Sequence, residues 1–199
     1  MTISPTLDDL QQAGFPMGGE PLVAVDLADT LMTAQEPVVD LLAAPDRLST
    51  WWRLEKARLP EAPEPAEAMT RRLRTAIRDV FDAHVEHRAP QQASVVALNA
   101  TAAAVPTSPQ LSWDGKIPGE ASTRWHTERG GNAALSAIAR ETIELLSSPA
   151  QLGRLRRCAN PACSMLFLAE TKRRQWCTAN ICGNRARVAR HYRRTHETG

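Results

Sequence analysis

The sequence predicts a mainly α-helical fold with a small β-hairpin, followed by a short cysteine-rich module built from a second hairpin and a helix. Three observations support this prediction. Apolar residues recur at helical spacing through most of the first 150 residues. Prolines and glycines separate these periodic segments. All four cysteines of the chain fall in its last 42 residues.

The N-terminal residues 1–18 are expected to form a flexible segment, because prolines and glycines interrupt any periodic pattern there. Residues 19–150 are expected to form a helical domain. Its first element is a short helix within residues 19–32, although the beginning of this stretch fits a strand equally well.

Three helices are expected in the middle of this domain. The first covers residues 46–59, with Asp46 as its candidate N-cap and its two tryptophans in the core. The second, over residues 66–87, is amphipathic. The third, over residues 91–104, is rich in alanine.

A turn, a hairpin and a further helix complete the domain. Pro106 and Pro109 are expected to force a turn. Residues 111–113 and 123–126 flank a segment rich in glycine and proline, which indicates a β-hairpin. Residues 132–147 form a helix whose first residue, an asparagine, can cap it.

Opposite charges divide the chain. Residues 151–199 hold eleven of the 24 Lys and Arg residues and two of the 22 Asp and Glu residues, so their formal charge is +9 and that of residues 1–150 is −7. A basic segment attracts phosphate polymers, whereas an acidic one does not. The division predicts two modules with different partners.

The sequence indicates a cytoplasmic protein without membrane contact. No segment approaches the ~18 consecutive apolar residues that span a membrane. The first residues carry acids rather than the basic and then apolar pattern of a signal peptide. In the cytoplasm, cysteines are better candidates for metal ligands than for structural disulfides.

Four cysteines, Cys158, Cys163, Cys177 and Cys182, follow the spacing C-x4-C-x13-C-x4-C. Two close pairs with a longer spacer can supply four thiolates at tetrahedral corners. The pattern predicts one zinc ion per chain, with a structural role because four thiolates leave no open position for water. An iron–sulfur cluster also uses four cysteines, but the spacer favours zinc.

The spacer between the cysteine pairs is long enough for a hairpin. Residues 167–168 would form its first strand, residues 172–174 its turn and residues 175–176 its return strand. With the helix after the last cysteine, this arrangement would resemble a treble clef. The module has few apolar residues, so metal binding, worth on the order of 10–16 kcal/mol, would decide whether it folds.

The segment after the last cysteine predicts a helix with one basic side. Residues 185–194 contain good helix formers and no breaker. Val188 and Tyr192 fall on another side and are expected to pack on the zinc-binding loops. Arginine suits bidentate contact with guanine edges or phosphate. The candidate nucleic-acid contacts are Arg173, Arg174, Arg185, Arg187, Arg190, His191, Arg193 and Arg194.

These cysteine-linked motifs resemble the CGNR zinc finger, which takes its name from the tetrapeptide at 182–185. The matching segments are CANPAC at 158–163, LFL at 166–168, RRQWC at 173–177 and CGNRAR at 182–187. The resemblance implies zinc ligation by the four cysteines.

The opening stretch from Gly19 to Thr30 is similar to the start of the ABATE domain, which usually precedes that finger in bacterial proteins. Together the two resemblances cover roughly residues 14–195. They imply a stress-induced transcription regulator. The family commonly has asparagine at the position of Asp29, so this chain departs from the pattern there.

Three functions remain open at this point. The first is a DNA-binding transcription regulator, associated with the nucleoid, whose N-terminal domain senses an effector or forms a homodimer that reads two half-sites. The second is a zinc-stabilised module that binds protein or RNA without sequence-specific DNA binding. The basic side of the helix could also be a solvated surface. The sequence names neither an effector nor a target site.

An enzyme is the third possibility, and the sequence argues against it. No motif brings together the candidate acid–base groups, which are Asp26, Asp29, His84, His87 and His126. A possible ligand pocket comprises Asp26, Thr30 and Arg140. The first two lie four residues apart on one helix, and Arg140 is a charge on an otherwise apolar helix.

Overall fold

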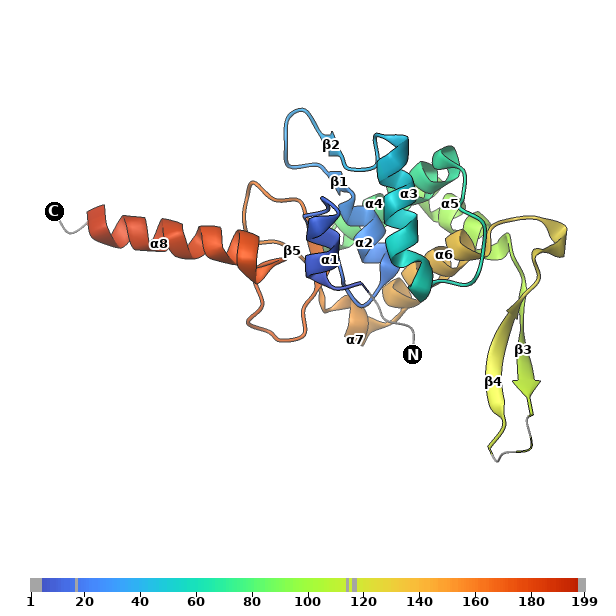
Figure 1. Ribbon diagram of the computed structural model, residues 1–199. Helices are drawn as coiled ribbons and strands as arrows, with labels where there is room; N and C mark the ends of the chain where they lie inside the picture. The colour runs from blue at the N-terminus through green and yellow to red at the C-terminus, as the bar shows by residue number, and fades with distance from the viewer. Residues whose placement is uncertain (1–4, 17, 114, 116–117, 197–199) are drawn as a thin grey trace.

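In the computed structural model, residues 5–16, 18–113, 115 and 118–196 are described. Helix α8 (Asn184–His196) projects from one end of a helical body, and a ribbon of β3 (Thr107–Ser112) and β4 (Glu120–Trp125) projects from the other (Figure 1). The helices of the body are α1 (Leu7–Gln12), α2 (Val23–Asp29), α3 (Pro45–Glu55), the 3-10 turn η1 (Lys56–Arg58), α4 (Glu67–Val85), α5 (Gln92–Ala103) and α6 (Ala133–Ser147). The expected mainly helical fold with a small hairpin is confirmed.

Helix α2 lies at the centre of the body, and all of its residues are buried. It packs against α4 and α6. Trp51 of α3, Phe81 of α4 and Ile138 of α6 contribute large buried side chains to the same core. Trp51 and Trp52 meet edge to face with ring centroids 4.9 Å apart, so both tryptophans belong to the core as predicted.

The described part of the N-terminal segment, residues 5–16 and 18, forms a helix and contributes to the core, which contradicts the flexibility predicted for it, whereas residues 1–4 and 17 of that prediction lie outside the described residues. Thr6 and Asp9 form a capping box that starts α1, since each side chain bonds the backbone N–H of the other. Leu10 and Phe15 are buried in the core. Arg47 donates to the carbonyl groups of Ala13 and Gly14 and lies over the Phe15 ring. The segment is therefore held by tertiary contacts that its periodicity does not reveal.

The starts of two other helices illustrate what capping chemistry predicts. Asn132 caps α6, because its side chain accepts from the Leu135 N–H at 3.1 Å, as predicted. Helix α3 instead begins at Pro45, with Ala44 at the N-cap position, so the predicted cap at Asp46 is wrong. Proline fits the first helical position because its fixed φ suits the helix and no N–H is needed there.

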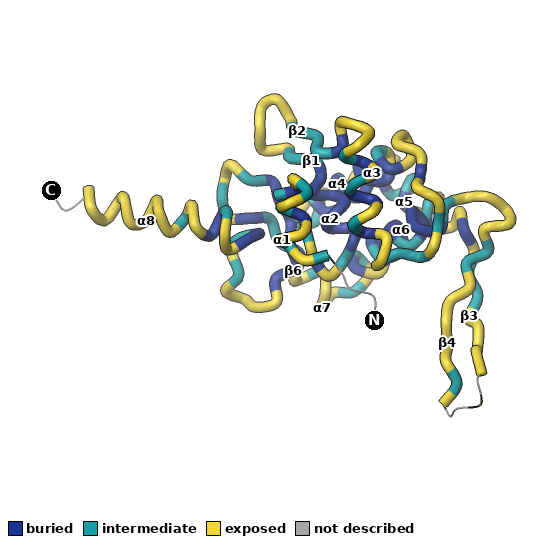
Figure 2. Tube along the Cα trace, in the orientation of Figure 1, coloured by how far each residue is buried: buried dark blue, intermediate teal, exposed yellow. Residues whose placement is uncertain are grey.

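The β3–β4 ribbon confirms the hairpin but corrects its surroundings. Its register pairs Thr107 with Trp125 and Ser112 with Glu120. The chain bends at residues 104–105, directly before Pro106, but Pro109 lies within a strand, so the turn predicted at Pro109 is wrong. Both strands of a two-stranded ribbon are edges, so a proline without an N–H can be accommodated. The ribbon is largely exposed along its length (Figure 2).

Short elements complete the body and the C-terminal module. A two-residue hairpin of β1 (Leu31–Met32) and β2 (Val39–Asp40) follows α2, and the 3-10 turn η2 (Thr127–Arg129) follows the ribbon. The C-terminal elements before α8 are α7 (Pro149–Leu152), β5 (Leu155–Arg157), β6 (Leu166–Leu168) and the π-helical turn η3 (Ala179–Gly183).

Strand β6 pairs with β5, from Leu155 opposite Leu168 to Arg157 opposite Leu166. The predicted hairpin between residues 167–168 and 175–176 is therefore wrong. One edge of β6 faces β5. The other edge is capped by carboxylates of the helical body, and residues 175–176 form no strand. The first cysteine pair lies in the loop between the two strands.

Candidate metal centre and basic helix

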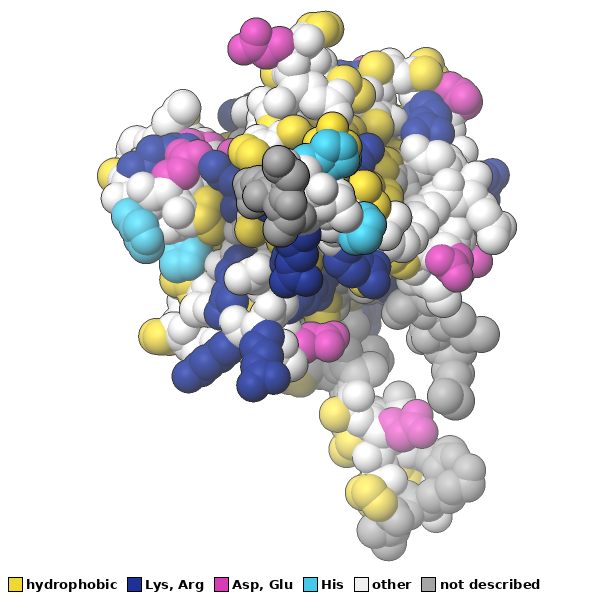
Figure 3. Space-filling model, turned by 90° about the vertical axis from the view of Figure 1, so that its left-hand side faces the viewer, with side chains coloured by type: hydrophobic (Ala, Val, Ile, Leu, Met, Phe, Trp, Pro, Cys, Tyr) yellow, Lys and Arg dark blue, Asp and Glu magenta, His cyan; other side chains and the backbone are white. Residues whose placement is uncertain are grey.

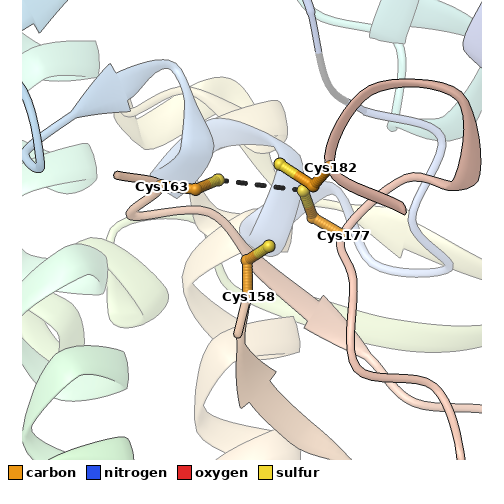
Figure 4. Close-up of side chains that lie close together, drawn as sticks. All are labelled: Cys158, Cys163, Cys177 and Cys182. Atoms are coloured by element: carbon orange, nitrogen blue, oxygen red, sulfur yellow. Dashed lines mark hydrogen bonds between the residues drawn. The ribbon is translucent and has the colours of Figure 1, made fainter. Parts of the chain in front are cut away.

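Four cysteine side chains from two separate segments converge on one point (Figure 4). The Sγ atoms of Cys158, Cys163, Cys177 and Cys182 all lie within 4.8 Å of one another, and those of Cys163 and Cys177 are 3.8 Å apart. Thiolates at ~2.3 Å from zinc, placed at tetrahedral corners, are about 3.8 Å apart. The cluster therefore has about the size that one zinc ion requires.

Asn160 links the loop of the first cysteine pair to the second pair. Its backbone carbonyl accepts from the Cys163 N–H at 2.9 Å, and its side-chain oxygen accepts from the Ala162 N–H at 3.1 Å. Its Nδ2 reaches the Sγ of Cys182 at 3.6 Å. A single short side chain therefore shapes one ligand loop and orients a ligand of the other.

The thiols influence one another's protonation. Hydrogen bonds from Cys163 and Cys177 lower the pKa of Cys158 to about 2, whereas the same sharing of protons raises the pKa of Cys163 to about 12 and raises that of Cys177 as well. Thiolates this close repel one another, so Cys158, Cys163 and Cys177 ionise together only around a cation. A divalent metal ion that deprotonates its thiol ligands resolves this conflict.

The metal centre is enclosed. Three of its cysteines are buried, and Met165 and Phe167 pack against them. Four thiolates fill the tetrahedral coordination sphere of zinc and leave no position for a reacting water molecule. The donor set and its burial support one structural zinc ion per chain, as predicted.

Helix α8 begins directly after the fourth cysteine and leaves the module without covering it (Figure 1). None of its residues is buried, and Val188 and Tyr192 are each 61% exposed. The predicted packing of these two side chains on the zinc-binding loops is wrong. Phe167 already packs beside the cysteines. The Tyr192 ring instead stacks on the His196 ring of the same helix, with the ring centroids 3.8 Å apart.

The surface of α8 is strongly basic, with five arginines and no acid. Figure 3 views this end of the molecule and shows Lys and Arg side chains gathered around it. In the part of the chain that the structure describes, Arg185, Arg190 and Arg193 form no hydrogen bond or ion pair. Arg187 donates to the Ala179 carbonyl at 3.2 Å. Arg185, Arg190 and Arg193 thus present positive charge that no acid among the described residues neutralises.

The two arginines of the spacer have different surroundings. Arg173 is exposed, as expected of a nucleic-acid contact. Arg174 forms an ion pair with Glu20 at 2.7 Å, donates to the Cys177 carbonyl at 2.7 Å and lies over the Phe167 ring. These contacts use the Arg174 guanidinium within the molecule. The prediction that Arg174 contacts nucleic acid is therefore corrected.

The residues of the predicted ligand pocket do not come together. Asp26 pairs with Arg58 at 2.7 Å, and the Thr30 hydroxyl donates to a backbone carbonyl of its own helix. Arg140 donates to the carbonyl of Val105 at 2.6 Å and to the Thr107 hydroxyl at 2.9 Å, where it anchors the ribbon. It serves the connection between α5 and β3, so the predicted pocket is wrong.

Two buried carboxylates that join the body to the zinc module were not predicted for that role. Both oxygens of Asp29 accept from the Leu166 N–H, at 2.9 and 3.0 Å. Glu20 Oε2 accepts from the Leu168 N–H at 2.9 Å. Burial raises the pKa of Asp29 well above its usual range. Both residues belong to the opening motif of the chain, and their spacing gives no sign of a distant partner.

Arg78 and Arg157 strengthen the same junction. Arg78 of α4 donates to the Ser164 carbonyl at 2.5 Å, and Arg157 of β5 pairs with Asp82 at 2.7 Å. Ser164 follows the second cysteine directly in the chain. The junction therefore fixes the metal-binding loop against the helical body.

Comparison with known proteins gives two family matches. Residues 22–149 match the ABATE family, described as "Putative stress-induced transcription regulator", and residues 154–195 match the CGNR zinc finger. No curated protein matches the chain. Among the described residues, no helix is both long enough and apolar enough to cross a membrane.

Proposed function

Since the chain belongs to the ABATE family and carries a CGNR zinc finger, we propose that it is a zinc-dependent, DNA-binding transcription regulator. One observation carries the proposal. A helix with five arginines, no acid and no buried residue leaves the zinc centre directly after its last ligand, Cys182. Such a helix has little to pack against within its own chain and is suited to a polyanionic partner.

The dimensions of α8 agree with duplex DNA. Its 13 residues span about 20 Å at ~1.5 Å per residue. The major groove of B-DNA is about 12 Å wide and admits an α-helix. Arginine in that groove can form two hydrogen bonds with a guanine edge, and arginine at the rim can pair with phosphate.

The other parts of the molecule would support this contact. Zinc would hold the cysteine loops in place and thereby set the direction in which α8 leaves the module. The ABATE domain would sense an effector or form a homodimer, because regulators often read two half-sites. The proposal assigns no catalytic step, and it implies a cytoplasmic protein that associates with the nucleoid.

The test is a titration of the zinc-loaded protein against mixed-sequence duplex DNA at two salt concentrations. Arg187→Ala and Arg190→Ala should each weaken binding while zinc content stays at one per chain. Arg72→Ala is the matched control, because Arg72 is an exposed helical arginine of the ABATE domain. Unchanged DNA binding in both α8 variants would sink the proposed contact.

The exposed pair of Val188 and Tyr192 favours a second candidate function, a zinc-stabilised module for a protein or RNA partner. Phosphate contacts release counterions, so a salt slope near zero would indicate a protein partner. Tighter binding to single strands than to duplex would indicate RNA, with Tyr192 as a possible stacking group.

A further inference from the structure

A cleft of about 400 Å³ lies between α8 and the zinc-binding loop of residues 159–162. Trp176 and Cys182 line it beside the zinc centre. The α8 side is formed by two alanines and three arginines, which are Ala186, Ala189, Arg185, Arg190 and Arg193. The cleft is therefore bounded on one side by the metal-fixed loop and on the other by the basic helix.

The chemistry of the cleft suits a chain of sugars and phosphates. None of the described residues that line it is acidic, and its three arginines have no partner within the described residues. Trp176 is half-buried and, with the alanines and Pro161, adds apolar surface. A phosphodiester strand offers both a negative charge at each phosphate and the apolar face of a sugar.

The cleft uses a different side of α8 from the one that carries Arg187 and His191. Arg185, Ala189 and Arg193 are four residues apart and lie on the side that faces the zinc-binding loop. Arg187 and His191 lie on another side and do not line the cleft. A helix in the major groove has phosphate backbone along its flanks and base edges in front of it, so two basic sides can meet two kinds of group.

We propose that this cleft binds the backbone of one DNA strand while the side of α8 with Arg187 and His191 meets the base edges. The inference rests on the proposed function and deepens it, because it divides the basic residues of the helix into two roles. Arg185, Arg190 and Arg193 hold phosphates, and they position the helix without reading sequence.

Two kinds of variant test this division. Arg193→Ala removes one phosphate contact, so affinity should fall alike for every duplex sequence and the slope of log K against log salt should become shallower by about 0.9. Ala189→Phe fills the cleft without changing charge, and it should weaken binding to every sequence. Both positions are exposed, so folding and zinc content should be unaffected.

Val188→Phe is the matched control, because it adds the same ring beside Ala189 on a side of α8 that does not line the cleft. It should leave the salt slope unchanged. The expected sequence-independent losses in the two cleft variants would support the assignment.

The outcomes separate the inference from the function on which it rests. A wild-type protein that binds no DNA overturns the proposed function itself. If the wild-type protein binds DNA in a salt-dependent way, and Arg193→Ala and Ala189→Phe bind with the same affinity and the same salt slope, the cleft assignment alone is overturned. A change of preferred sequence in Arg193→Ala also overturns the cleft assignment, since it would mean that this arginine meets a base.

Discussion

Replacing Asp29 tests whether the ABATE domain and the zinc finger form one structure. The Asp29 side chain is 3% exposed, and both of its oxygens accept from the Leu166 N–H. Asp29→Ala leaves this buried N–H without an acceptor, a loss of about 1–3 kcal/mol. It also removes a carboxylate 3.4 Å from the buried Arg78, which keeps its ion pair with Asp82 at 2.9 Å.

Asp29→Ala should lower the free energy of unfolding by about 2–4 kcal/mol. Removing the whole partner of a buried ion pair costs ~3–5 kcal/mol. The loss should be smaller here because Arg78 keeps its second carboxylate partner, Asp82. Asp29→Asn should lose much less, since an amide oxygen can still accept from Leu166.

The pH dependence follows from the direction in which burial shifts the pKa of Asp29, which is upward. A carboxyl group whose pKa is raised on folding binds its proton more tightly in the folded state, so it lowers stability as pH rises from about 4 through its folded pKa. Asp29→Asn removes this contribution and should flatten the decline of stability with rising pH.

Urea unfolding of the zinc-loaded protein, followed by circular dichroism, measures both effects. Zinc release to a chelator should also be faster in Asp29→Ala, because Leu166 lies three residues after Cys163. Two results would refute the reasoning. One is a wild-type unfolding midpoint in Asp29→Ala, and the other is equal destabilisation by alanine and asparagine.

Three further predictions concern other parts of the molecule. Cys163→Ser should lose most of its bound zinc and melt at a lower temperature, and a full zinc content in a metal assay would contradict the tetrathiolate site. Burial raises the pKa of Glu141 to about 7, so the contribution of this group to stability should fall as pH rises from about 4 to 7. Glu141→Gln lacks this contribution, so its free energy of unfolding, measured by urea titration, should fall less over that pH range than that of the wild type. Parallel plots of unfolding free energy against pH for the two proteins would contradict the prediction. Arg140→Ala should free the β3–β4 ribbon, cost about 1–3 kcal/mol and speed limited proteolysis there, whereas an unchanged cleavage pattern would show that other contacts anchor it.

The elements that the sequence predicts well are those whose signal is local. Helix α6 combines an asparagine cap with apolar residues at helical spacing, and both features appear in the structure. The four cysteines converge as their spacing indicates. Metal chemistry restricts the geometry so strongly that residue type and spacing suffice.

The elements that the sequence misses depend on distant partners. Phe15 orders the N-terminal segment only because the core has a place for it and Arg47 lies over its ring. Strand β6 lacks its predicted return strand because Glu20 and Asp29 cap the edge that this strand would have used. The sequence suggests that Arg174 is a surface cation, because nothing near it in the chain indicates its ion pair with Glu20. In each case the deciding group lies more than thirty positions away.

The carboxylates that cap β6 also determine whether the zinc finger can be transferred to another protein. A fragment of residues 151–199 would contain every metal ligand, yet the N–H groups of Leu166 and Leu168 would have only water as acceptor. Because metal affinity includes the free energy of folding the site, the excised fragment should hold zinc less tightly than the whole chain. The finger is a separate family match in sequence, but we expect part of its affinity for zinc to depend on Glu20 and Asp29 in the first thirty residues of the protein.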